Sequence, residues 1–160
     1  MKNNNSIKLY NVMFPIWFFF FFPVMWLIIL PVNFLVDSLV LCLSAKRQQV
    51  DERKTLWKKH ILPVWGIGFL SDLIGAGLVF LIYLILVEIP GLVDVFNPIT
   101  FPGTCIISLP GVALAGWLIY ILNRKLTFRK SQLDTAVIHK ICLHLAIFTA
   151  PYTMLIPLYW

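Results

Sequence analysis

The sequence predicts an all-α integral membrane protein with four transmembrane helices in a compact bundle. Of its 160 residues, 60% are hydrophobic and 12% are charged, which is more apolar surface than a water-soluble core of this size can bury. Four apolar runs separated by charged clusters also reach roughly 20 residues, the length that a helix needs to cross a hydrocarbon core about 30 Å thick. We therefore expect one polytopic domain over residues 1–160, with helices at about 23–45, 61–87, 105–122 and 136–158.

The first apolar run, residues 12–45, is too long for one crossing and too short for two crossings with a turn between them. Pro23 removes a backbone donor and disfavours helix at Phe22. The first spanning helix is therefore expected to run from about Pro23 to Ala45. Residues 7–22 would precede it as a Phe-rich segment in the outer interface, and a kinked helix through the whole run is the alternative.

Positive charge is concentrated in two of the three expected loops. Loops 46–60 and 123–135 are rich in Lys and Arg, whereas loop 88–104 contains neither. Because basic loops stay on the cytoplasmic side, we expect a protein of a bacterial-type inner (plasma) membrane with both termini extracytoplasmic. The basic residues are expected to contact anionic lipid headgroups rather than nucleic acid. They are Lys46, Arg47, Arg53, Lys54, Lys58, Lys59, Arg124, Lys125, Arg129 and Lys130.

Polar residues inside the apolar runs are the most informative feature of the sequence. Counted inward from the cytoplasmic helix ends, Asp37, Asp72 and His144 fall at a similar depth of about 12–14 Å. Asn33 lies one turn from Asp37, and Lys140 lies one turn from His144, on the same helix face. Charged groups in a membrane usually face the bundle interior and are paired, so we expect these five residues to form one buried polar layer. That layer is either a structural lock between helices or a site for a proton or small cation.

Small residues form stripes on the second and third expected helices. They recur at three- and four-residue spacing, and they are Gly68, Ser71, Gly75, Ala76, Gly111 and Ala115. Stripes of this kind let helix backbones approach closely in a membrane. We expect a tight contact between the second and third helices. The alternatives are a homodimer formed through one stripe and a glycine enrichment that makes no contact.

No residue pattern typical of an enzyme or a metal site is found in the sequence. Cys42, Cys105 and Cys142 are widely separated and form no C-x-x-C motif. His139 and His144 are five residues apart, and neither an H-E-x-x-H motif nor a nucleophile elbow occurs. We therefore expect no catalytic residue, no metal ligand and no cofactor.

One local run resembles a known family. Residues 123–130 read NRKLTFRK, which resembles the N-R-[KR]-aromatic-T-F-[RK] run of GtrA-like small membrane proteins, a family associated with translocation of lipid-linked sugars. Leu126 stands in place of the usual aromatic residue. The run also follows the third expected helix here, whereas the family tends to place it after the second. The resemblance is confined to this run, and no site residue is transferred from it.

Four short helices with little mass outside the membrane favour a non-catalytic role. We expect an accessory or scaffold subunit of a membrane complex, which packs on other membrane subunits or on itself as a homo-oligomer. The alternative is a small oligomeric transporter or channel for a proton, a small cation or a lipid-linked substrate, with the buried Asp and His layer as its working groups. A pore-forming lysis protein is a third class, which buried charges do not favour.

Overall fold

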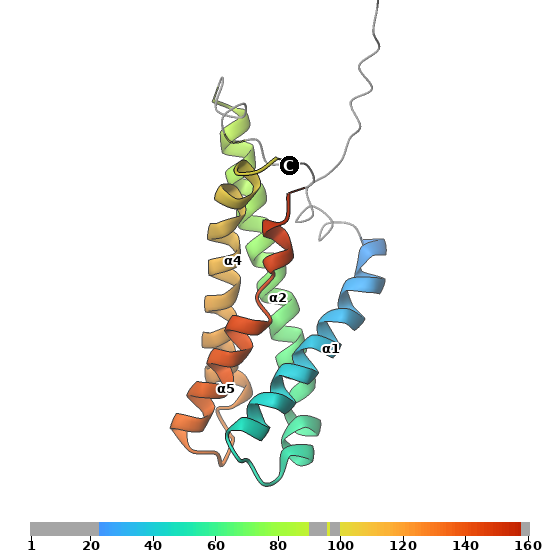
Figure 1. Ribbon diagram of the computed structural model, residues 1–160, viewed down its shortest axis with the longest axis vertical. Coiled ribbons are helices and arrows are strands. Elements are labelled where there is room, and N and C mark those ends of the chain that lie inside the picture. The colour runs from blue at the N-terminus through green and yellow to red at the C-terminus, as the bar shows by residue number, and fades with distance from the viewer. Residues whose placement is uncertain (1–22, 90–95, 97–99, 158–160) are drawn as a thin grey trace, which may run out of the picture.

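The structure is a computed structural model that describes residues 23–89, Phe96 and 100–157, and its regular elements are helices (Figure 1). Three described helices are long and apolar enough to cross a membrane: α1 (Pro23–Arg47), α2 (Arg53–Val87) and α4 (Gly103–Leu122). A π-helix, η2 (Asn123–Thr127), extends α4, and α5 (Thr135–Phe148) and a short 3-10 helix, η3 (Tyr152–Leu155), complete the described order. The Phe-rich segment expected at residues 7–22 lies outside the described residues.

Prolines do not divide the three long helices. α1 is described from Pro23 because residues 1–22 lie outside the described residues, so the start predicted for the first spanning helix stays a prediction. Pro31, Pro63 and Pro110 lie inside α1, α2 and α4 without ending them. Each of the three helices therefore continues through its internal proline.

α2 begins earlier than the sequence predicts. Its first residue is Arg53, whereas residues up to 60 were expected in a loop, so the loop between α1 and α2 is short. The added turns are amphipathic: Leu56 and His60 are buried, and Lys54, Lys58 and Lys59 are exposed. An amphipathic face of this kind stabilises helix by packing. With 35 residues, α2 is about 52 Å long and exceeds a hydrocarbon core of about 30 Å.

The continuous fourth helix predicted over residues 136–158 does not form. α5 has 14 residues, or about 21 Å, and is too short to cross a membrane alone. Pro151 follows its end, and a proline disfavours helix at the preceding residue and cannot donate a backbone hydrogen bond. The chain then continues as η3, which packs on α4.

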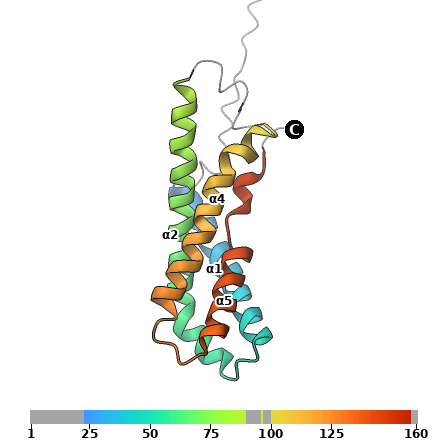
Figure 2. The same ribbon diagram turned by 90° about the vertical axis from the view of Figure 1, so that its left-hand side faces the viewer.

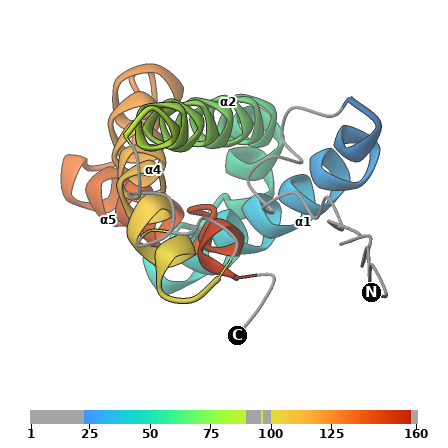
Figure 3. The same cartoon turned by 90° about the horizontal axis from the view of Figure 1, so that it is seen from above.

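The helices pack in an order that leaves α1 at one side. α2 and α4 share the most extensive contact, α5 lies beside α4, and α1 contacts α2 and α5. Figure 2 shows α4 lying across α2, with α5 beside it. In Figures 1 and 3 the beginning of α1 leans away from α2 and α4, while its end lies in the bundle.

Two apolar clusters form the core. The first includes Leu41, Val64 and Leu145 and lies toward the end that carries the α1–α2 turn. The second includes Ala76, Val79 and Met154 and lies toward the other end. Along α2, the residues between Val64 and Ala76 separate the two clusters. This interval contains Asp72.

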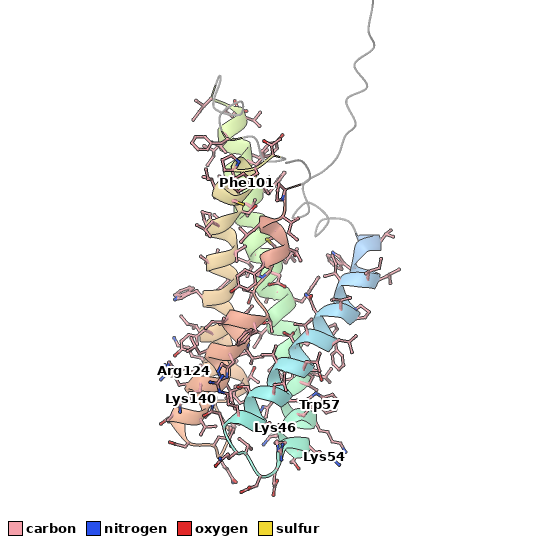
Figure 4. The ribbon with its side chains drawn as sticks, in the orientation of Figure 1. Lys46, Lys54, Trp57, Phe101, Arg124 and Lys140 are labelled. Carbon is pink, nitrogen blue, oxygen red and sulfur yellow. The ribbon has the colours of Figure 1, made fainter. Side chains whose placement is uncertain are left out.

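The basic residues gather at one end of the bundle. Figure 4 labels Lys46, Lys54, Arg124 and Lys140 there, whereas Phe101 lies at the opposite end. All ten basic residues assigned to the lipid surface are exposed. The two basic loops, which are separated by α2 and α4 in the sequence, therefore share one end of the molecule.

Candidate carboxyl site between α1 and α2

Two buried carboxyl groups from different helices lie close together in the bundle. Asp37 on α1 is 3% exposed and Asp72 on α2 is 4% exposed. Asn33 lies one turn before Asp37 on α1, and its Nδ2 donates a hydrogen bond to Asp72 Oδ2 at 3.2 Å. The spacing of four residues on α1 therefore aims an amide and a carboxyl at α2 together. We call Asn33, Asp37, Asp72, Gly68 and Thr149 the carboxyl site.

Gly68 and Thr149 complete the surroundings of Asp37. A Cβ atom at Gly68 would lie 3.0 Å from Asp37 Oδ2, so the missing side chain makes room for the carboxyl group. Thr149, which follows the end of α5, lines one small cavity together with Asp37. Its hydroxyl donates to Leu145 O at 2.8 Å. Three helices therefore meet at the carboxyl site.

The carboxyl oxygens of the carboxyl site do not all have hydrogen-bond partners among the described residues. Asp37 Oδ2 and Asp72 Oδ1 are buried and have no hydrogen-bond partner among the described residues. Both side chains line a cavity of about 10 Å³, close to the smallest volume that holds one water molecule. Among the described residues, no Lys, Arg or His lines this cavity. Two carboxylates that repel each other in such a place need a proton or a cation between or beside them.

His144 and Lys140 do not join the carboxyl site. The ring of His144 is bonded through Nδ1 to Ser44 Oγ at 2.7 Å, and Lys140 is exposed. Counting residues from helix ends gives equal depth only when helices run parallel and start at the same height. α1 is inclined to the others (Figure 1), so Asp37 meets α5 at Thr149 rather than at His144. Thr149 was not predicted as a site residue, because in the sequence it is only a threonine two residues before Pro151.

The small-residue stripes lie in two different contacts. Gly75 and Gly111 bring α2 and α4 together, since a Cβ at Gly75 would lie 2.6 Å from Gly111 O and 3.1 Å from Ala115 Cβ. Ala76 and Ala115 are fully buried in the bundle. Ser71 bonds its own helix, donating to Ile67 O at 2.7 Å. Gly68, by contrast, faces α1 at the carboxyl site.

The run NRKLTFRK ends α4 with a compact set of hydrogen bonds. Asn123 Nδ2 donates to Ile119 O at 2.9 Å, and Thr127 Oγ1 donates to Asn123 Oδ1 at 2.9 Å. The Phe128 N–H donates to Asn123 O at 3.0 Å, which closes the wide turn of η2. Phe128 is 1% exposed, and its ring lies 4.9 Å from the ring of His60 on α2. The run therefore fastens the end of α4 to the beginning of α2.

Comparison with known proteins found no matching family model, no matching curated protein and no matching solved structure.

Proposed function

We propose that this chain is a multi-pass membrane protein that takes up a proton or a small cation at the carboxyl site, as a small transporter or channel. Insertion in a membrane is supported by the outward faces of the long helices. Leu27 and Leu43 on α1 are 77% and 63% exposed, and Leu109 on α4 is 59% exposed. Side chains of this kind favour contact with lipid over contact with water.

The proposed orientation has the basic end in the cytoplasm. The two basic loops share that end of the bundle, as the preference of Lys and Arg for the cytoplasmic side requires. Both termini then lie outside, and α5 with η3 makes the fourth crossing. The irregular backbone after α5 suits this role because Pro151 and Met154 are buried in protein, and non-helical backbone at membrane depth is tolerated where protein covers it.

The observation that carries the proposed function is the pair of buried carboxyl groups, which have no basic partner in the part of the chain that the structure describes. A lock built from ion pairs would satisfy each charge with a residue of opposite sign, and the partners expected for it, His144 and Lys140, lie elsewhere. The end of α5 at Thr149 adds partial negative charge, because the last carbonyls of a helix point there. Discontinuous helices whose ends face an ion are typical of ion sites in transporters.

Cation-dependent stability tests this proposal. Thermal unfolding of the purified chain in detergent is measured in Na⁺, Li⁺ or K⁺ against choline at constant ionic strength, and across pH. A cation that binds only the folded chain stabilises it by about 2.7 kcal/mol at one hundred times its dissociation constant. We expect the unfolding midpoint to rise with one of these cations or with protons, and Asp37→Asn or Asp72→Asn to remove that dependence.

Asp51→Asn is the matched control, because Asp51 is an exposed carboxylate outside the site. It should keep the wild-type dependence on cations and pH. Proteoliposomes then test transport with a pH-sensitive or sodium-sensitive dye inside the vesicle. A wild-type chain whose stability and flux ignore both cations and pH would overturn the proposal.

A scaffold subunit is the second candidate, and the outer face of α1 favours it. Its large apolar residues are exposed along the helix, including Leu35 and Leu39 at 61% and 62%, and the beginning of α1 leans away from α2 and α4 (Figure 3). A partner helix would fit that face. This candidate predicts no flux in proteoliposomes and a specific membrane subunit, or a second copy, cross-linked through α1.

A further inference from the structure

A groove between α1 and α5 opens at the basic end of the bundle. It encloses about 370 Å³, which is within the range of small-ligand sites. Val40 and Leu43 on α1 and Phe148 on α5 form its apolar walls, and its other lining residues are Ser44, His144 and Arg47. The groove is separate from the carboxyl site, since the two cavities have no lining residue in common.

The polar groups of the groove are arranged for an anion. Ser44 Oγ and His144 Nδ1 are bonded at 2.7 Å, and when the hydroxyl donates, the ring proton is on Nε2, where it can be donated to a ligand. Arg47 is exposed at the last turn of α1. Among the described residues, no Asp or Glu lines the groove. The positive charge of Arg47 is therefore not offset by an acidic residue among the described residues that line the groove.

The direction of the groove matches that of a lipid in a bilayer. Arg47 lies at the basic end, with Lys46 beside it in the sequence (Figure 4). Val40 lies seven residues earlier on α1, about 10 Å further from that end. With the basic end at the cytoplasmic face, as proposed above, the cationic group stands at the height of lipid headgroups, and the apolar walls extend toward the hydrocarbon.

We propose that this groove binds one anionic phospholipid of the cytoplasmic leaflet. Arg47 and His144 contact the phosphate, because a guanidinium and an imidazole N–H both donate hydrogen bonds to phosphate oxygens. One acyl chain lies along Val40, Leu43 and Phe148. This site is more specific than attraction of lipid to the basic loops, since it depends on a defined cavity.

Native mass spectrometry of the full chain in detergent tests the lipid site. Phosphatidylglycerol and phosphatidylcholine of equal chain length are added, and the bound fraction of each is measured. We expect wild type to retain phosphatidylglycerol over phosphatidylcholine. Arg47→Gln should weaken retention of phosphatidylglycerol about fivefold, the factor expected for one basic residue. Leu43→Trp, which fills the groove, should reduce retention of both lipids.

Two control variants separate the groove from general charge and from added bulk. Lys140→Gln removes an exposed basic residue that lies at the same end of the molecule but does not line the groove. Leu62→Trp adds an indole to an exposed position on α2. Both should bind lipid as wild type does. Equal weakening by Arg47→Gln and Lys140→Gln, or a second copy or another protein in place of lipid, would overturn the proposal. Arg47→Gln changes an exposed residue, so it should fold even if Leu43→Trp does not.

Discussion

Gly111→Val is expected to leave little folded protein. A Cβ at position 111 would lie 2.6 Å from Gly75 O, a backbone atom of α2, and would also collide with Val79 Cγ2. A backbone carbonyl cannot rotate away as a flexible side chain can, so α2 and α4 would have to separate. Overpacking of this kind costs about 3 kcal/mol or more. Size-exclusion chromatography and thermal unfolding in detergent measure the loss.

Gly77→Val is the matched control because it makes the same change on α2. No atom lies within 4 Å of a Cβ at Gly77, so the valine meets open space. We expect its unfolding midpoint to remain close to that of wild type. If Gly77→Val and Gly111→Val lose equal amounts of folded protein, the close approach of α2 and α4 does not limit stability. Gly75→Val should behave as Gly111→Val does, because the two glycines face each other.

The sequence contained enough information to predict where helices α2 and α4 approach. Glycines and alanines at three- and four-residue spacing fall on one face of a helix whatever lies around it. In a membrane, that face has few uses other than close packing. A feature that depends on the spacing of residues along one helix can therefore be predicted from the sequence.

The carboxyl site could be predicted only in part. Asn33 and Asp37 share a face because they are four residues apart. Asp72 meets them because polar side chains on apolar helices face the bundle interior and pair with one another there. Which residue of α5 reaches them depends on the inclination of α1 and on where α5 ends. Pro151 ends α5, whereas Pro31, Pro63 and Pro110 do not end their helices. Neighbouring helices decide between these outcomes, and the local sequence does not specify them.

Phe128→Ala is expected to destabilise the bundle by about 3–5 kcal/mol, the usual cost of removing a buried aromatic side chain. Phe128 is 1% exposed and belongs to the first apolar cluster. Its ring also contacts His60 at a centroid distance of 4.9 Å. The cavity left by alanine would lie where α4 meets the beginning of α2. Denaturant or thermal unfolding of the purified chain in detergent measures the change.

Leu126→Ala tests whether this effect is due to packing or to the altered end of α4. Leu126 lies two residues earlier in the same run and is 62% exposed, so its truncation should change stability by no more than about 0.5 kcal/mol. A similar loss for both variants would mean that the η2 turn, rather than the Phe128 ring, sets stability there. A large difference would mean that Phe128 joins α4 to the added turns of α2. Those turns carry Lys54, Lys58 and Lys59, so the same contact would also fix part of the basic end relative to the bundle.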